Sequence, residues 1–337
     1  MRFKHPLRAA AVIAAVLTVA TYGLGFLAER FGGHVAFLAF AALLLTPAGL
    51  TASASLGLRA PLKLDDFSNQ GVNQKATLAV TRGSAYHDIL IECYTNGVAM
   101  TVAQMKSMID TITVKLNGKP IQEWTPTTLD IVNSTYGAQY AITNGFMRLY
   151  FAEPYNRSME GEERGAWGTD GIDSFTIELK TNNTAVVPTF VAWGNVDEGN
   201  RSIRSFPIRH VRNSGALAVV AGTSQVPNPL REVGMFYRRL HFLSALISKV
   251  KIQTQKVTKW DDLPRAVVAE LLAKRGFALQ ANVYTVAFDM TSAQLTDQLA
   301  TFIPTNPPVL VPDLRIEYTG TGAGTVEIVS EQYQLFN

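Results

Sequence analysis

Residues 86–123 read YHDILIECYTNGVAMTVAQMKSMIDTITVKLNGKPIQE, and this stretch decides the fold class. An apolar strand, Ile89 to Cys93, runs into an Asn96-Gly97 turn. A second strand, Ile112 to Leu116, is closed by Asn117-Gly118. Asn-Gly is the strongest short signal for a hairpin, because both residues tolerate positive φ. The stretch therefore predicts part of a β-scaffold.

Short helices interrupt this half of the chain. Thr101-Val102-Ala103-Gln104 is a capping-box pattern that predicts a helix to Met108. A weaker helical pattern covers Thr128 to Tyr136 and stops at Gly137. Both segments are short, so we interpret them as inserts in a β-fold.

Outward from this stretch the signals are short alternating runs bounded by Gly, Pro, Asn and Asp. Several short strands with turns between them favour a sandwich or barrel over alternating β and α units. The first half has strand candidates at Ala76–Thr81, Ile89–Cys93, Ile112–Leu116, Phe146–Phe151, Ser174–Leu179 and Pro188–Trp193. The second half has candidates at Ile208–Val211, Leu217–Ala221, Lys249–Thr254, Val283–Phe288, Leu314–Tyr318 and Thr325–Glu331.

Helices are also predicted in the second half, at Leu263–Arg275 and Ser292–Thr301. The polar, glycine-rich stretch Gly194 to Asn200 predicts a loop or the connection between the halves. No tight sequence repeat links the halves, which share only their architecture. The fold class that we expect is all-β, with two tandem sandwiches.

The distribution of charge along the chain argues against a nucleic-acid partner. The chain has a formal net charge of +3, and residues 1–58 carry Arg2, Lys4, Arg8 and Arg30 against Glu29. The rest of the chain is therefore neutral, whereas a nucleic-acid-binding body shows clustered Lys and Arg on one face. The weak basic groupings later in the chain favour solvated strand edges or subunit contacts: Arg201, Arg204, Arg209, Arg212, Arg231, Arg238 and Arg239.

The N-terminal 58 residues are apolar and differ from the rest of the chain. Residues 9–28 carry no charge, and twenty apolar residues in a helix match the hydrocarbon thickness of a bilayer. An A-x-A pattern at Ala52-Ser53-Ala54 resembles a signal-peptide cleavage site. Four readings stay open: an export signal, a helical membrane hairpin, an extension outside the mature protein, or a buried pair of helices.

The sequence contains no coherent catalytic or metal-binding motif. The five histidines have no partners at metal-ligand spacing, and His87 favours a structural role. The single cysteine, Cys93, lies in an apolar run and is expected to be a small buried hydrophobe. The stretch Gly222-Thr223-Ser224-Gln225 lacks the second glycine of a nucleophile elbow. Gly320 to Gly324 lies between two strands, which favours a hairpin loop over a phosphate cradle.

Acidic clusters and sequons carry weak signals. Glu160, Glu162 and Glu163, with Asp170 and Asp173, could serve glycoside hydrolysis or calcium binding, but a solvated run is the default reading. N-x-S/T triplets begin at Asn133, Asn156, Asn182 and Asn200 and matter only in a glycosylating pathway. The sequence therefore predicts no catalytic, cofactor-binding or metal-binding residues and no enzyme.

The order of strands and turns resembles a known family. Tyr86 to Lys119 is similar to the N-terminal domain of major capsid proteins from tailless icosahedral phages with an internal membrane, the tectivirus-like and corticovirus-like phages and related proviruses. Gly145 to Phe151 with Pro154 and Trp167 to Leu179 continue the resemblance. Its closing segments are Ala287–Asp289, Leu314–Tyr318 and Ala323–Ile328. The resemblance covers about residues 62–337, and the long apolar N-terminus departs from it.

The resemblance implies two jelly-roll sandwiches in one chain, a double jelly roll with short helical inserts. We expect an apolar N-terminal segment at 1–58, a first jelly roll at 59–196 and a second at 197–337. The implied function is a viral major capsid subunit, located in the virion and assembled in the bacterial host cytoplasm. Implied partners are the chain itself as a homotrimer, neighbouring trimers, other capsid and vertex proteins, and the viral membrane through residues 1–58. No specific nucleic acid is expected.

Two other functions remain as alternatives. An exported or membrane-anchored β-sandwich could act as an adhesin or carbohydrate-binding module, with Tyr and Trp residues on its loops. An envelope hydrolase would use the acidic clusters around Glu162 and Asp170. The capsid hypothesis is favoured because the two-part β architecture contains no coherent catalytic constellation.

Overall fold

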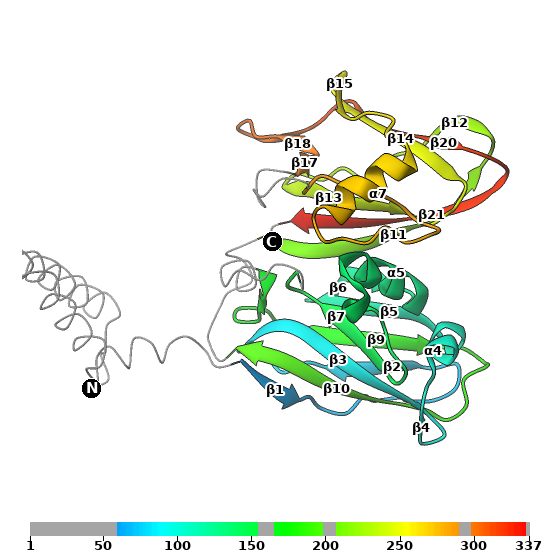
Figure 1. Cartoon of the computed structure of the whole chain (residues 1–337). Coiled ribbons are helices and arrows are strands. Elements are labelled where there is room, and N and C mark those ends of the chain that lie inside the picture. Colours follow the sequence, from blue (N-terminus) through cyan, green and yellow to red (C-terminus); the bar gives the residue numbers. More distant parts are fainter. Residues whose placement is uncertain (1–58, 154–164, 198–206, 290–297, 335–337) are drawn as a thin grey trace, which may run out of the picture. The chain divides into compact units, whose positions relative to one another are not determined.

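The computed structural model describes residues 59–153, 165–197, 207–289 and 298–334, which belong to one compact unit, Arg59–Asn337 (Figure 1). Within these ranges, no helix has the length and apolarity needed to cross a bilayer. The apolar segment 1–58, with the readings left open for it, lies outside the described residues.

The first half of the unit forms a jelly roll of two facing sheets. One sheet has the strand order β1-β10-β3, with β7 also paired to β3, and the other has the order β2-β9-β5-β6. Lettered B to I in chain order, these strands follow the jelly-roll orders B-I-D-G and C-H-E-F. Their bounds are β1 Arg59–Lys63, β2 Lys75–Ala79, β3 Ala85–Thr95, β5 Ile109–Leu116, β6 Lys119–Trp124, β7 Phe146–Tyr150, β9 Phe175–Thr181 and β10 Pro188–Asp197, with short strands β4 Val98–Ala99 and β8 Trp167–Gly168 beside β3.

The second half repeats the same topology. One sheet has the order β11-β21-β13-β16 and the other β12-β20-β14-β15, which again reads B-I-D-G and C-H-E-F. The bounds are β11 Ile208–Val219, β12 Gly222–Gln225, β13 Met235–Phe242, β14 Ile247–Thr254, β15 Val257–Trp260, β16 Tyr284–Ala287, β20 Leu314–Gly320 and β21 Gly324–Gln334, with short strands β17 Leu299–Ala300, β18 Phe302–Ile303 and β19 Val309–Leu310. The all-β class and the two tandem jelly rolls are confirmed.

A strand pair joins the two rolls. Strand β6 of the first roll lies parallel to β11 of the second, with Val211 opposite Gln122, so one nine-stranded sheet runs through both rolls. Because the pair is parallel, the two rolls point the same way. The start of β11 and the turn at Asn117-Gly118 before β6 lie at the same end of the unit.

Each roll carries a helix at the same topological position, between its F and G strands. In the first roll this is α5 (Pro126–Tyr136), capped by Thr125, with η1 (Ala138–Tyr140) after it. In the second roll it is α7 (Arg265–Ala273). Among its described residues the first roll has one further helix, α4 (Val102–Met108), and the Thr101–Gln104 capping box of this helix forms as predicted.

The core lies between the sheets of each roll because the strands alternate. Ile89, Ile91 and Cys93 on β3 are fully buried, whereas Leu90 and Glu92 between them are partly exposed. Aromatic rings fill the first core, where Phe151 stacks on Trp167 with their centroids 4.3 Å apart. Alternation of this kind is what a sheet with one buried face requires.

Several sequence predictions need correction. The helix predicted at Ser292–Thr301 is wrong in the part that the structure describes, because Leu299–Ala300 forms strand β17. Residues 292–297 lie outside the described residues. The loop or connection predicted at Gly194–Asn200 is wrong for its first four residues, because strand β10 continues through Asp197. Strand β13 was missed, since its charged Arg238 and Arg239 interrupt the apolar pattern. The hairpin turns at Asn96-Gly97 and Asn117-Gly118 are confirmed by their positive φ angles.

Candidate functional site

The candidate site is the junction of the two rolls, where charged side chains are buried. The β11-β21-β13-β16 sheet turns one face away from its own core, and we call this face the second outer face. Its residues are buried within the chain: Arg209, Val211, Arg239, His241, Val329, Glu331 and Tyr333. Fully buried charges are rare in proteins unless they are paired, so each one calls for a partner.

Glu331 on β21 is the centre of this junction. Its carboxylate accepts hydrogen bonds from Nε and Nη2 of Arg209 at 2.8 and 2.6 Å. The His241 Nε2 atom lies 2.7 Å from the other carboxylate oxygen. Burial raises the pKa of the Glu331 carboxyl, but the Arg209 charge and the His241 hydrogen bond outweigh it and hold the pKa well below its usual range.

The first roll contributes directly to this network. Tyr136, at the end of α5, donates its hydroxyl hydrogen to Glu331 and accepts a hydrogen bond from Arg209 at 3.2 Å. Arg209 also donates to the backbone carbonyl of Tyr150 at 2.9 Å. Burial raises the pKa of the Tyr136 hydroxyl, so it stays protonated and can donate. The network therefore spans both rolls.

A second group of ion pairs lies beside the first. Arg238 pairs with Glu153, which follows β7, and Tyr333 donates to the same carboxylate at 2.8 Å. Arg239 pairs with Asp289 and lies over the Tyr136 ring, with its guanidinium carbon 4.7 Å from the ring centroid. Burial raises the pKa of Asp289, but Arg239 and Arg238 outweigh it and lower the pKa below its ordinary value.

The equivalent face of the first roll has a different character. This first outer face belongs to the sheet β1-β10-β3-β7. It consists of the outward residues Asp88, Leu90, Glu92, Tyr94, Phe146, Arg148, Val191, Trp193 and Asn195. Most of these side chains are half-buried or exposed within the chain. Its polar groups pair mainly with one another: Trp193 donates to Glu92 at 3.0 Å, and Asn195 donates to Asp88 at 3.0 Å.

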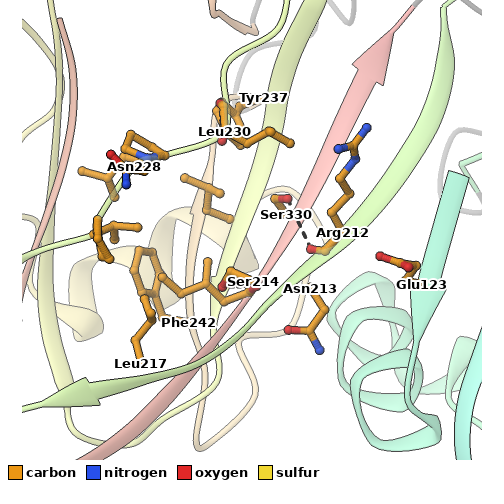
Figure 2. A pocket seen from close by; sticks show the side chains of 16 residues that line it. Glu123, Arg212, Asn213, Ser214, Leu217, Asn228, Leu230, Tyr237, Phe242 and Ser330 are labelled. Atoms are coloured by element: carbon orange, nitrogen blue, oxygen red, sulfur yellow. Dashed lines mark hydrogen bonds between the residues drawn. The ribbon is translucent and has the colours of Figure 1, made fainter. Parts of the chain in front are cut away.

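A cavity of about 420 Å³ lies between the sheets of the second roll (Figure 2). Its wall is largely apolar, with Leu217, Leu230 and Phe242 among its side chains, and Arg212 and Glu123 also line it. The volume falls in the range of small-molecule sites. Arg212, however, already pairs with Glu232 at 3.2 Å, and Glu123 adds a second carboxylate. Because charges of both signs line the cavity, they do not indicate whether a ligand would be anionic or cationic.

The chemistry of the junction is that of fixed pairs. A buried carboxylate with arginine, tyrosine and histidine partners at hydrogen-bond distance holds two elements in one register. Among the described residues, no group of three or more His, Cys, Asp or Glu side chains could hold a metal ion. The arrangement is therefore suited to fixing the geometry of two rolls.

The structure accounts for the residues singled out in the sequence. His87 is buried and lies 2.6 Å from Asp197, which fits the structural role expected for it. Cys93 is buried, and burial raises the pKa of its thiol. Gly320 and Gly324 flank the predicted hairpin loop between β20 and β21. Ser224 lies within strand β12 and not on a strand-to-helix turn.

The basic groupings are a correction. Arg209, Arg238 and Arg239 are buried in ion pairs at the junction of the rolls, not on solvated strand edges; the Arg238–Glu153 pair joins the two rolls, and the other two pairs lie within the second roll. Arg212 is partly exposed, and Arg231 donates to the carbonyls of Val311 and Pro312. Arg201 and Arg204 lie outside the described residues.

The acidic clusters and sequons gain no support. Asp170 and Asp173 are exposed, whereas Glu160, Glu162 and Glu163 lie outside the described residues. Asn133 is buried and donates to the carbonyl of Arg148, so it is not a glycan acceptor in the folded chain. Asn182 is bonded to Ser107 and Asp110, and Asn156 and Asn200 are not described.

Sequence reasoning missed Tyr136, Glu331 and Asp289 as functional residues. Tyr136 was read only as the end of a weak helix, and Glu331 only as the end of a strand. Their partners are distant in sequence: Tyr136 and Glu331 are 195 residues apart. A charged residue at an alternate strand position normally predicts a solvated face, and no local signal shows that a second roll covers it.

Solved structures share this architecture. The major capsid protein P2 of bacteriophage PM2 aligns with a TM-score of 0.70 at 20% identity, over 83% of this chain and 98% of that one. A chain of Sulfolobus Turreted Icosahedral Virus aligns with a TM-score of 0.56 at 11% identity, over 83% and 91%. The Faustovirus major capsid protein aligns with a TM-score of 0.57 at 6% identity, over 83% and 90%. The fold is thus that of double jelly-roll capsid proteins.

Family models identify the group within this class. The model for the viral coat protein P2 N-terminal domain matches residues 61–197, and the model for the P2 C-terminal domain matches residues 208–335. The chain belongs to the viral coat protein P2 family. No curated protein sequence matches the chain.

Family membership settles the broad function. The chain is a structural capsid protein of the virion that assembles with itself, and it is not an enzyme. The capsid hypothesis from the sequence is confirmed. The alternative of an exported binding module gains no support from the comparisons.

Proposed function

We propose that the chain is a major capsid subunit that assembles as a homotrimer with a pseudo-hexagonal footprint, and that such trimers tile an icosahedral shell. The observation that carries this proposal is the parallel pairing of β6 with β11, which aligns two rolls of the same topology. Three copies would supply six similar rolls, all pointing the same way. Closed cyclic assemblies of this kind need no further partner.

The direction of the rolls suggests which end faces a membrane. Arg59 begins β1 opposite Asp197, the end of β10, and the turn at Asn117-Gly118 lies at the same end. The turn at Gln255-Lys256 marks the matching end of the second roll. Residues 1–58 precede Arg59 in the chain, so they are attached at this end. We place the end facing the viral internal membrane here, with residues 1–58 as the contacting segment.

The finer assignments belong to the same proposal. The domains are the apolar segment 1–58, the first roll 59–196 and the second roll 197–337. Neighbouring trimers, other capsid proteins and vertex proteins are the remaining partners, a provirus is one source of such a chain, and assembly takes place in the bacterial host cytoplasm. No catalytic, cofactor-binding or metal-binding residue is assigned.

Sedimentation of the full chain in mild detergent tests the proposal. A species of three times the chain mass, together with particles that contain the chain, is the expected result. Flotation with lipid vesicles tests the membrane contact, and the expected result is binding that limited proteolysis before Arg59 abolishes. A stable monomer at micromolar concentration, with no particles in any preparation, would contradict the proposal.

A further inference from the structure

Two equivalent sheet faces of the unit are covered to different extents. The second outer face is buried inside the chain, in part by Tyr136 and Glu153 of the first roll, and its charged residues Arg209 and Glu331 are almost fully inaccessible. The first outer face has the same strand order, yet its Phe146 is 40% exposed, and Trp193 and Leu90 are partly exposed. Within the described residues, the first outer face has no covering element that matches the one on the second.

The C-terminal end of α5 covers part of the second outer face, and Phe277, which follows α7 in the second roll, also lies against Arg239 on this face. Helix α5, between β6 and β7, ends in Tyr136, which bonds to Glu331 and lies against Arg239. The second roll carries the topologically equivalent helix α7 between β15 and β16. Helix α7 buries Val268 and Leu272 against its own roll, while Val267 is 43% exposed and Leu271 partly exposed. This helix therefore has an apolar side that is not used within the described chain.

We infer that α7 of one copy packs on the first outer face of the next copy, as the C-terminal end of α5 contacts the second outer face within the chain. This inference rests on the proposed trimer and names its contact surfaces. Each copy then offers one uncovered face and one unused helix, in different rolls. Such a heterologous contact closes into a ring of three copies if neighbouring copies are related by a rotation of one third of a turn. The ring then contains three junctions within chains and three similar junctions between chains.

The residues of the two surfaces are suited to each other. Trp193, Tyr94 and Phe146 give the first outer face aromatic side chains of the kind that concentrate in interfaces. Glu92 lies among them and accepts hydrogen bonds from Trp193 at 3.0 Å and Tyr94 at 2.7 Å. The C-terminal end of α7 carries the exposed Lys274 and Arg275, whose charges are complementary to this carboxylate.

Charge substitutions on exposed side chains test the inference in the full chain. Val267→Asp on α7 and Phe146→Asp on the first outer face should each raise the dissociation constant of the trimer by about ten-fold or more. Val220→Asp is the matched control, because Val220 is 57% exposed between β11 and β12 and belongs to neither surface. Sedimentation gives the oligomeric state, and circular dichroism with thermal unfolding checks that each variant is folded.

Cross-linking supplies a second measurement that does not depend on a loss of assembly. Cys93 is fully buried, so the double variant Phe146→Cys with Val267→Cys presents two reactive thiols. A short bis-maleimide should link the double variant into covalent dimers and trimers, and each single variant should give only traces. A wild-type trimer that both Asp variants leave intact, with no covalent trimer, overturns this inference alone. A monomeric wild-type chain overturns the proposed trimer as well.

Discussion

The two outer faces show how one topology can meet two environments. The second outer face places Arg209, His241 and Glu331 in a water-excluded junction where every charge has a partner. The first outer face has Leu90 and Trp193 on the strands equivalent to those of His241 and Glu331, with Phe146 on β7 beside them, and leaves all three partly exposed. The first roll belongs to the same chain as the second outer face, so it is present in every folded subunit and can supply fixed partners for the buried charges. The first outer face has no such partner within the described residues, and its side chains are ones that can be exposed to solvent.

The buried ions are better understood as fixing register than as adding stability. Removing two charges from water costs several kcal/mol per ion, and a buried pair regains this only with good geometry and additional hydrogen bonds. Glu331 has those bonds from Arg209, Tyr136 and His241. Because a slip between the rolls would leave these groups unpaired, the network selects one arrangement of the two rolls.

The largest expected effect comes from breaking the centre of the junction. Glu331→Gln leaves the Arg209 guanidinium buried without its counter-charge, so the free energy of unfolding should fall by about 3–5 kcal/mol. Urea denaturation followed by tryptophan fluorescence measures this loss. A variant as stable as the wild type would show that the junction is hydrated in solution.

The next effect concerns pH and a histidine on β11, between Arg209 and Val211 of the second outer face but on the opposite side of the sheet. His210 is buried on β11, and burial together with the Arg212 charge lowers the pKa of its imidazole from 6.5 to about 4. The unfolded chain therefore binds a proton that the folded chain does not between these values, so stability is full above pH 6.5 and falls as the pH drops toward 4. The expected loss by pH 4 is about 3 kcal/mol.

Unfolding at a series of pH values checks this slope. His210→Gln removes the titrating group, so the stability of the variant should change less between pH 6.5 and 4 than that of the wild type. The stability that the lowered pKa of the Glu331 carboxyl provides is lost only as the pH falls below about the ordinary value of 4.5, and this loss is expected in the wild type and the variant alike. Equal slopes for wild type and variant would exclude His210 as the source.

A smaller effect tests the contribution of the first roll to the junction. Tyr136→Phe keeps the ring against Arg239 but removes the hydroxyl that bonds to Glu331 and Arg209. The expected loss is about 1–3 kcal/mol, because buried polar groups are left with one partner fewer. Urea denaturation again gives the value, and a larger loss from Tyr136→Ala would separate ring packing from hydrogen bonding.

The smallest effect is expected on the first outer face. Arg148 lies 3.5 Å from Asp88, and its side chain is 44% exposed. Arg148→Gln should change the free energy of unfolding of the subunit by less than about 1 kcal/mol, as for other exposed ion pairs. A loss as large as that of Glu331→Gln would show that the two faces do not differ in the way proposed here.

The local elements could be predicted from the sequence where a residue type fixes the backbone. Asn117-Gly118 takes the positive φ angles of a tight turn, and the Thr101–Gln104 box caps its helix. The turn at Gln255-Lys256 has the same positive φ angles without Asn or Gly, so no local signal marks it. Strand β13 was missed for a related reason, because its two arginines hide a buried strand.

Local sequence patterns were enough to predict a β-rich chain with two halves of one style and a resemblance to a capsid family, because alternation, turn residues and caps act over a few neighbours. Only the tertiary structure decided which charged strands are buried. The pairing of β6 with β11 brings Tyr136 to Glu331 across 195 residues, and that contact turns a polar strand face into an interior one. Burial of a sheet face depends on what packs against it, and that partner lies far away in the sequence.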